Sequence, residues 1–208
     1  MNLLQQLNWR YATKIFDPSR SVNGEDIAYL KEAVRLSPSS YGLQPYRVLV
    51  IHNRDLQERL VEASYGQRQV ADASHVFVFC NIRLDRQAVD DYMQLIKKQR
   101  GTPDDVLDAK AARLWGKISE MGAEKSAEWA ARQSYIAMTQ LLIACAEKKI
   151  DSCPIEGFEP EKYSGILGLE EKGLYPVLVV PVGYRHPADA HAKDAKVRKE
   201  PEDLFIEL

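Results

Sequence analysis

Two short apolar runs constrain the fold of this chain most strongly. The segments His75–Ile82 (HVFVFCNI) and Tyr175–Gly183 (YPVLVVPVG) are rich in β-branched and aromatic residues, and both are apolar at both alternating sets of positions. A strand of this kind has no face that suits water, so it belongs inside a sheet that is covered on both sides. We therefore predict two central strands with helices above and below them.

Further strand and helix patterns complete a mixed layout. Two more strand candidates are Arg47–His52 and Ile150–Ile155. Apolar periodicity and end signals predict helices over Leu3–Trp9, Gly24–Leu36, Asp55–Ala63, Arg86–Arg100, Asp104–Met121 and Ala127–Lys148. The last of these carries apolar residues on faces too wide for a surface helix, so we expect it to be central and buried. No linker or repeat divides the sequence, and we predict a single domain over residues 1–208.

The composition excludes several classes of protein. The chain has 28 Lys and Arg against 30 Asp and Glu, which gives a formal net charge of −2. Because an unselective nucleic-acid binder carries a basic excess, we expect no nucleic-acid partner. The longest apolar stretch, Leu141–Ala146, is far shorter than the ~18 residues that suggest a membrane span. The N-terminus also lacks the pattern of a signal peptide, so we expect a cytoplasmic protein with no membrane partner.

The residue patterns of metal and hydrolytic chemistry are missing from the sequence. Cys80, Cys145 and Cys153 form no close pair, and we predict that each is a small buried apolar residue. The four histidines are scattered without HExxH spacing, so we expect no metal site. Neither GxSxG, GxxxxGK[ST] nor GxGxxG occurs, which removes the simple arguments for a hydrolase, a P-loop protein or a Rossmann dehydrogenase.

Four polar segments are candidates for binding, and each has an alternative structural interpretation. Arg10 and Lys14 are cations four residues apart that either hold a phosphate or form a solvated pair. The loop Ser37–Pro45 either turns the chain or offers hydroxyl groups to a ligand. The glycine in Cys153–Phe158 either permits close approach of a flat ligand or simply ends a strand. In the basic segment Lys193–Lys199, alternate side chains share one face if the chain is extended.

The two ends of the chain add a combined hypothesis. Arg10, Lys14, Lys196 and Arg198 supply enough cations to clamp one phosphate. The terminal segment Leu204–Leu208 is apolar, and we expect it to dock on its own sheet or on that of a partner.

The order and spacing of these segments resemble the FMN-dependent nitroreductase family, in particular its oxygen-insensitive NAD(P)H nitroreductase and dihydropteridine reductase branch. The residues that carry the resemblance are Arg10–Lys14 with Phe16 and Asp17, Ser37–Ser40 with Gln44 and Pro45, Asp72–His75, Ala127–Trp129 with Gln133, Pro154–Phe158, and Lys196–Arg198. The resemblance implies an α+β nitroreductase-like fold whose central mixed sheet is flanked by helices. It also implies an intertwined homodimer with an exchanged C-terminal segment, a long buried helix at the interface, and two FMN sites between subunits.

The resemblance further implies roles for individual residues. Arg10, Lys196 and Arg198 correspond to residues that grip the FMN phosphate, and Lys14 to one beside the flavin N1 and O2 edge. The cofactor-binding set is Arg10, Tyr11, Ala12, Lys14, Pro38, Ser39, Ser40, Gln67, Gln69, Gln133, Pro154, Ile155, Glu156, Gly157, Lys196 and Arg198. Within it, Pro38–Ser40 come from the other subunit, and the backbone N–H of Glu156 or Gly157 lies near flavin N5. Lys14 and Glu156 are the catalytic candidates, and Tyr41 and Trp115 are candidates for the substrate pocket. A helix anchor is an equal alternative for Trp115.

The sequence departs from the family pattern at several of these positions. Tyr11 and Ala12 stand where the family usually has a His-Ser pair, and Gly42 stands where Asn is common. Gln69 replaces a lysine that often contacts the pyrimidine edge of the flavin, although Gln67 and Gln69 can still form hydrogen bonds there as neutral amides. We expect these changes to affect the redox potential rather than the identity of the cofactor.

The activity implied by the resemblance is a two-electron reduction with ping-pong kinetics. NADH or NADPH is the electron donor, and flat electron-poor molecules such as nitroaromatics and quinones are the acceptors. The positive charge of Lys14 is expected to stabilise the reduced flavin and to raise its potential. Two alternatives remain: a dihydropteridine or flavin reductase with incidental nitro activity, and a non-catalytic FMN store or sensor.

Overall fold

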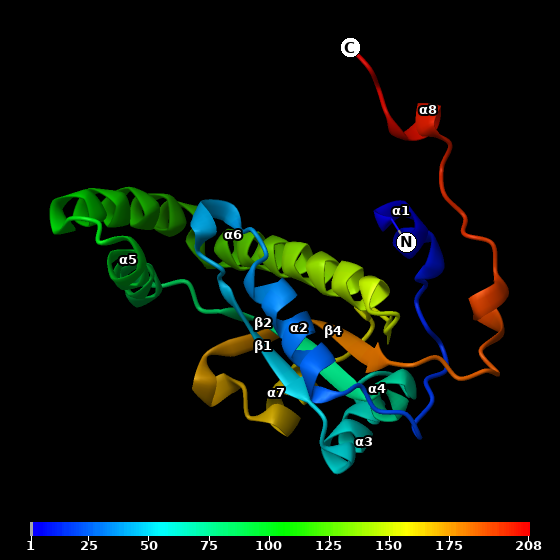
Figure 1. Cartoon of the computed structure of the whole chain (residues 1–208). Helices are drawn as coiled ribbons and strands as arrows, with labels where there is room; N and C mark the ends of the chain where they lie inside the picture. Colours follow the sequence, from blue (N-terminus) through cyan, green and yellow to red (C-terminus); the bar gives the residue numbers. More distant parts are fainter. Residues whose placement is uncertain (1) are drawn as a thin grey trace.

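A four-stranded sheet lies at the centre of the computed structural model, which describes residues 2–208 (Figure 1). The strand order is β1-β2-β4-β3, and all three pairings are antiparallel. The bounds are β1 Tyr46–Ile51, β2 His75–Ile82, β3 Asp151–Ser152 and β4 Leu174–Gly183. The two apolar runs therefore form the two inner strands, as predicted from their composition.

One edge of the sheet differs from the prediction. The expected strand Ile150–Ile155 shortens to β3, followed by an isolated antiparallel bridge between Ile155 and Val179. Ala12 lies beside Ser152 in a parallel bridge, which is the one parallel pairing within residues 2–208. The sheet is therefore mixed only at this edge, where the N-terminal segment runs beside β3.

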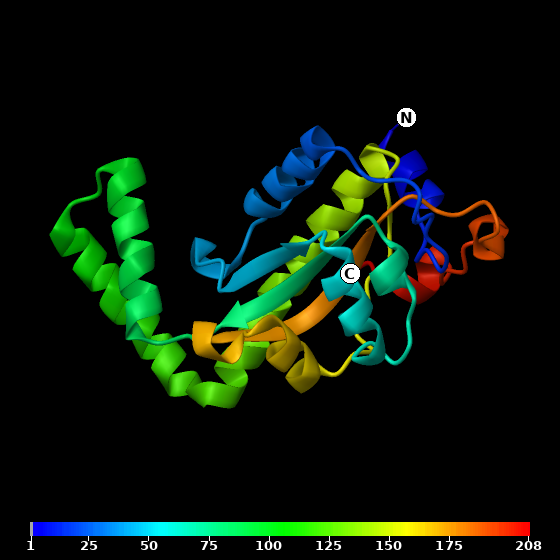
Figure 2. The same ribbon diagram turned by 90° about the horizontal axis from the view of Figure 1, so that it is seen from below.

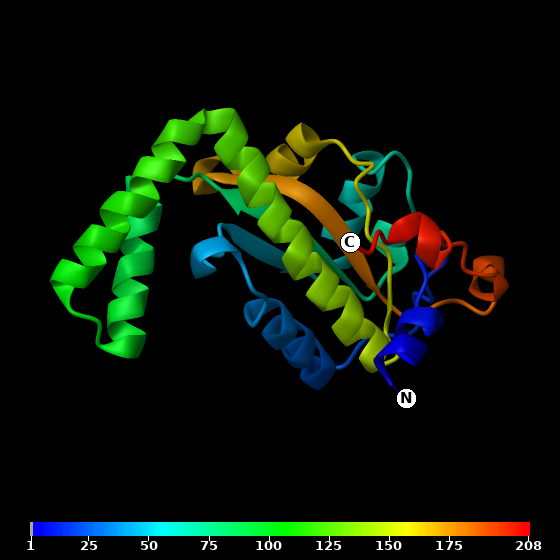
Figure 3. The ribbon, with the colours of Figure 1, turned by 90° about the horizontal axis from the view of Figure 1, so that it is seen from above.

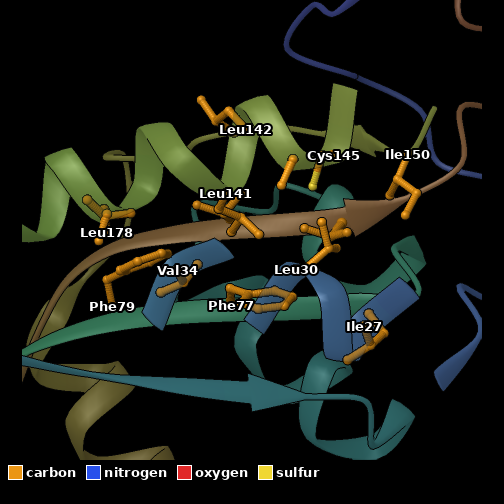
Figure 4. Packing of buried hydrophobic residues seen from close by; sticks show 14 of the residues in the cluster. Ile27, Leu30, Val34, Phe77, Phe79, Leu141, Leu142, Cys145, Ile150 and Leu178 are labelled. Atoms are coloured by element: carbon orange, nitrogen blue, oxygen red, sulfur yellow. The ribbon is translucent and has the colours of Figure 1, made fainter. Parts of the chain in front are cut away.

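Helices cover one face of the sheet with large apolar side chains. Helix α2 (Gly24–Arg35) and the second part of α6 (Asp104–Glu147) lie across this face (Figures 1 and 4). Phe77 and Phe79 of β2 and Leu178 of β4 pack here against the helices. A second core lies on the opposite face, where α3 (Arg54–Glu62), α4 (Gln69–Asp72) and α7 (Pro160–Leu167) cover the other side chains of the same strands. The inner strands are therefore buried on both sides, which explains why they are apolar throughout.

Helix α6 bends sharply and joins the sheet to a projecting pair of helices. Gly122 has a φ of 74° and a ψ of 174°, which interrupts the helix between the two segments that the sequence predicted separately. We call residues 86–121 the arm; it contains α5 (Arg86–Arg100) and the first part of α6, and it projects from the body of the molecule (Figures 2 and 3). The arm has its own apolar core, which includes Val89, Met93 and Leu114.

The remaining elements connect these layers. They are α1 (Leu3–Trp9), α8 (Pro201–Leu204) and the short 3-10 helices η1 (Ser40–Gly42), η2 (Glu170–Lys172) and η3 (Ala190–Lys193). All three cysteines are buried, as predicted, and burial raises the pKa of Cys80 to about 12. None of the helices within residues 2–208 is both long and apolar enough to cross a membrane.

The C-terminal segment extends away from the body of the molecule (Figure 1). Phe205 is 65% exposed and Ile206 is 87% exposed. The apolar terminus therefore does not dock on its own sheet, which removes one of the two alternatives that the sequence left open.

Candidate functional site

A cluster of cations forms where the two ends of the chain meet. Lys196 Nζ donates a hydrogen bond to the backbone oxygen of Arg10, which brings the C-terminal segment onto the N-terminal one. Burial lowers the pKa of Arg10, and the nearby charge of Arg198 lowers it further. The pKa of Lys196 is lowered in the same way, by burial and then by Arg10 and Arg198. The buried Nε of Arg10 has no hydrogen-bond partner. Three mutually repelling cations with an unsatisfied donor make a site that is complete only with an anion.

A buried carboxylate holds the N-terminal segment in place. Asp189 Oδ2 accepts hydrogen bonds from the backbone N–H of Lys14 at 2.8 Å and of Ile15 at 3.1 Å, and from the Tyr11 hydroxyl at 2.8 Å. Its other oxygen accepts from the backbone N–H of His191 at 3.2 Å. Burial alone raises the pKa of Asp189, but these donors outweigh it and hold the pKa below its usual value. Tyr11, one of the departures from the family pattern, is thus a partner of this carboxylate.

The loop after β3 lies beside this N-terminal segment. Cys153 is buried, which raises the pKa of its thiol, while the nearby charges of Lys14 and Arg10 oppose that rise. Ala12 forms a parallel bridge with Ser152, and the backbone N–H of Thr13 lies 3.5 Å from the Ser152 oxygen, so the Arg10–Lys14 segment runs beside the start of the loop Pro154–Gly157. The predicted phosphate-binding residues and the predicted flavin-face loop therefore come together in one chain.

Two side chains orient the Pro154–Gly157 loop. The hydroxyl of Tyr135 donates to Glu156 Oε1 at 2.6 Å, and burial together with this bond raises the pKa of Tyr135 to about 12. Gln67 Nε2 donates to the backbone oxygen of Gly157 at 2.7 Å. The side chain of Ile155 is buried in the core, and its backbone N–H and oxygen are both paired with Val179. Beside the loop lies an open hollow of about 330 Å³, lined by Tyr135, Met138, Pro154, Ile155, Glu156 and Leu178.

We call this assembly the cationic half-site. Its members are Arg10–Lys14, Gln67, Pro154–Gly157, Lys196 and Arg198. Gln69 begins α4 and makes no side-chain hydrogen bond within residues 2–208.

The loop between α2 and β1 forms a second, separate group. The backbone N–H of Ser40 donates to Gln133 Oε1 at 2.8 Å, and the N–H of Gln44 donates to Ser39 Oγ at 2.9 Å. Gln133 Nε2 in turn donates to the backbone oxygen of Trp129. The amide oxygen of Gln133 thus holds the loop while its nitrogen is bonded to the preceding turn of α6, a role the sequence did not reveal.

The backbone of this loop adopts positive φ values at Tyr41 and Gly42, and it is strained at Tyr41. Tyr41 has a φ of 59°, in the left-handed region that non-glycine residues rarely adopt. Gly42 has a φ of 73°, and a Cβ there would lie 2.6 Å from Tyr92 Oη. The Tyr92 hydroxyl itself donates to the backbone oxygen of Tyr41 at 2.6 Å. A side chain at position 42 would displace the Tyr92 hydroxyl, so glycine suits the close approach of Tyr92.

Lys117, which the sequence did not single out, and Trp129, which belongs to the motifs that carry the resemblance, both lie against Tyr41. Lys117 Nζ donates to Tyr41 Oη at 3.0 Å, and the Trp129 ring centroid lies 6.4 Å from that of Tyr41. We call Pro38–Gln44 together with Lys117, Trp129 and Gln133 the turn half-site. Trp115 lies instead beside a cavity of about 660 Å³ at the bend of α6, where it packs against the core of the arm.

The two half-sites lie on different sides of α6 in one chain. Gln133 contacts the turn half-site, whereas Tyr135 contacts Glu156 of the cationic half-site. Residues two positions apart on an α-helix point about 200° apart around its axis. The structure therefore gathers the predicted residues into two groups rather than one, and it separates Pro38–Ser40 from the cation cluster. Figure 3 shows the segment that contains η1 between the arm and the body part of α6, away from the two termini.

Comparison with known proteins identifies the family. The model of the nitroreductase family matches residues 7–184, and the chain belongs to this family, as the resemblance predicted. The chain is 30% identical to the oxygen-insensitive NAD(P)H nitroreductase of Salmonella typhimurium over 100% of both chains. It is 32% identical to the major NAD(P)H-flavin oxidoreductase of Aliivibrio fischeri, over 99% of this chain and 98% of the relative. An Exiguobacterium sibiricum protein crystallised in complex with FMN has the same fold, with a TM-score of 0.84 and 22% identity over 100% of this chain and 98% of that one.

Proposed function

We propose that two copies of this chain form an FMN-dependent oxidoreductase that takes electrons from NADH or NADPH and reduces flat, electron-poor acceptors. The observation that carries the proposal is the cation cluster of Arg10, Lys196 and Arg198 with its unsatisfied buried donor. A phosphate monoester supplies the charge and the acceptor oxygens that such a cluster lacks. The names of the relatives, NAD(P)H nitroreductase and NAD(P)H-flavin oxidoreductase, support the same activity.

The residues beside the cluster fit the rest of an FMN molecule. The hollow next to Pro154–Glu156 has apolar walls from Met138 and Leu178, which suit a flat ring. The amide nitrogen of Gln67 is bonded to the backbone oxygens of Ser64 and Gly157, and its Oε1 is left as an acceptor for the edge of a ring. The crystallised FMN complex of a protein with this fold supports the assignment.

The separation of the half-sites supports a homodimer. In one chain the turn half-site and the cationic half-site lie on different sides of α6, so a complete site requires the turn of a second copy. The exposed apolar terminus, which includes Phe205 and Ile206, is the segment we expect to pack on that second copy. Each active site would then combine Pro38–Ser40 of one subunit with the cations of the other.

The residues of the cationic half-site have distinct roles in this mechanism. Bound FMN supplies the chemistry by accepting a hydride from the nucleotide and passing two electrons to the acceptor. Arg10, Lys196 and Arg198 would hold its phosphate. Lys14 would provide the positive charge that favours the reduced, electron-rich form of the ring. The backbone N–H groups of Glu156 and Gly157 would donate hydrogen bonds to the ring, and Tyr135 orients Glu156.

A spectroscopic titration tests the proposal. We expect the purified protein to show flavin absorbance and to lose it when NADH or NADPH is added without oxygen. We expect Arg198→Ala to weaken FMN binding about ten- to hundredfold because it removes a charge-assisted contact, whereas the neighbouring Lys199→Ala retains normal affinity.

Two outcomes would contradict the proposal. A protein that takes up no FMN when reconstituted has no flavin function. A yellow protein that neither nucleotide bleaches is a store or sensor rather than an enzyme. A panel of nitroaromatics, quinones and quinonoid dihydropterin then identifies the acceptor.

A further inference from the structure

We propose that Lys117 and Tyr41 form a subsite for an anionic substituent, so that the enzyme prefers flat acceptors that carry a carboxylate. This inference rests on the proposed function, because it requires the turn half-site to face a flavin. It extends that function by naming a substrate class and the residue that selects it.

The first support is that the position of Tyr41 is strongly constrained. Its backbone adopts a left-handed conformation that costs free energy in a bulky residue, and such strain persists only where the surroundings hold it. Tyr92 binds the carbonyl of Tyr41, and Gln133 binds the preceding N–H group. The side chain is nevertheless 40% exposed. The fold thus holds an aromatic hydroxyl at the surface beside Ser39 and Ser40.

The second support is the unneutralised charge of Lys117. An ammonium group has three donors, and within residues 2–208 the structure gives Lys117 one hydrogen-bond partner, the hydroxyl of Tyr41. No carboxylate in that range lies within 4.0 Å of its Nζ, whereas Lys97 in the same arm is paired with Asp104. The ammonium also lies 5.6 Å from the Tyr41 ring centroid. The lysine is therefore oriented by Tyr41 and keeps donors free for an anion.

The third support is the aromatic surface beside this charge. Trp129 lies next to Tyr41 at an interplanar angle of 55°. Lys117 and Trp129 come from the two sides of the Gly122 bend, so the bend brings the cation and the indole to the same loop. Aromatic faces bind a flat ring, and the ammonium binds an anionic group at its edge. A planar aromatic carboxylate matches both features.

The pyrophosphate of the nicotinamide donor is also an anion that Lys117 could bind. In a ping-pong mechanism the donor and the acceptor react in separate half-reactions, so the effect of Lys117 on each can be measured separately. The oxidative half-reaction is measured with 4-nitrobenzoate and with its methyl ester, which differ only in the anionic group. The reductive half-reaction is measured with NADH and NADPH in the absence of an acceptor. Binding of 4-nitrobenzoate to the oxidised holoprotein is measured by calorimetry, without turnover.

The informative variant is Lys117→Gln, and the matched control is Lys125→Gln, an exposed lysine on the same helix without a side-chain partner in the described chain. We expect Lys117→Gln to lower kcat/KM for 4-nitrobenzoate about tenfold, through KM, and to weaken its binding by the same factor. The methyl ester, both reductive reactions and the thermal midpoint stay unchanged. Tyr41→Phe, which keeps the ring but loses the hydroxyl, gives a smaller loss of the same kind.

Three results would overturn the inference. If Lys117→Gln changes kcat/KM equally for the acid and the ester, or changes neither, Lys117 does not bind the anionic group. Slower reduction by the nucleotides with unchanged acceptor preference shows that the cation serves the donor instead. A wild-type protein that binds no FMN overturns the proposed function and the subsite together, whereas the first two results overturn the subsite alone.

Discussion

The two half-sites are built in opposite ways. The cationic half-site is assembled from segments far apart in the sequence, and its centre is a buried carboxylate that joins residues 178 positions apart. The turn half-site is mostly one continuous loop whose backbone is strained and fixed by α6 and Tyr92. The first half-site gathers several cations that repel one another, whereas the second is a loop whose backbone is held by hydrogen bonds within the chain.

This contrast predicts how each half-site responds to substitution. Changes in the cationic half-site should alter ligand affinity strongly, because its charges repel one another until an anion binds. Changes in the turn half-site should alter stability and specificity more than flavin affinity. Three substitutions test this difference.

The largest effect is expected from Asp189→Ala. The change leaves the N–H groups of Lys14, Ile15 and His191 without their acceptor, and we expect it to lower the free energy of unfolding by about 2–4 kcal/mol. The same loss of geometry should weaken FMN binding more than tenfold, since Arg10 and Lys14 belong to the released segment. Denaturant unfolding and flavin titration measure the two effects. The control is Asp194→Ala, which removes an exposed carboxylate that is hydrogen-bonded to His191. Equal losses of stability and FMN affinity in the two variants would show that Asp189 contributes no more than an exposed carboxylate.

A smaller effect is expected from Gly42→Ala. The new Cβ would lie 2.6 Å from Tyr92 Oη and sit at a φ of 73°, so we expect a loss of about 1–3 kcal/mol in unfolding free energy. Adding Tyr92→Phe removes the clashing oxygen and should restore part of that loss. FMN affinity should change less than in Asp189→Ala. A larger effect on FMN affinity than on stability would contradict the expected difference between the two half-sites.

The smallest effect concerns the pH dependence of FMN binding. The pKa of Lys196 is lowered by burial and by the two arginines, and a bound phosphate raises it again, so binding takes up a proton at alkaline pH. FMN affinity should therefore fall as the pH rises toward the usual lysine value, by at most about tenfold per pH unit for one proton. Lys196→Arg should remove this dependence, because arginine keeps its charge. If the FMN affinity of Lys196→Arg falls with alkaline pH as it does in the wild type, a group other than Lys196 takes up the proton.

Parts of the fold follow directly from local sequence. The inner strands were predictable because a strand buried on both faces is apolar at every position, and His75–Ile82 shows this without context. The two segments of α6 were predictable from apolar periodicity, and the bend at Gly122 falls in the gap left between them. The members of the cationic half-site were found through the order of several short motifs.

Other parts depend on contacts that leave no local signal. Asp189 lies in a polar stretch where one more acidic residue is unremarkable, and its role comes from partners near the other end of the chain. Lys117 and Trp129 meet Tyr41 only because α6 bends between them. The division of the predicted residues between two sides of α6 likewise requires the packed structure. The order of motifs along the sequence predicts which residues belong to the site, whereas the packed structure shows which of these residues lie together in one chain.

The bend at Gly122 separates the core of the arm from the cores on the sheet. Val89, Met93 and Leu114 pack together in the arm, and Leu43 of the turn half-site joins the same cluster. Substitutions in the arm can therefore accumulate without disturbing the strands that carry the cationic half-site. Lys117 lies on the arm, so under the proposed function the chemistry beside the acceptor can change without altering the residues of the cationic half-site.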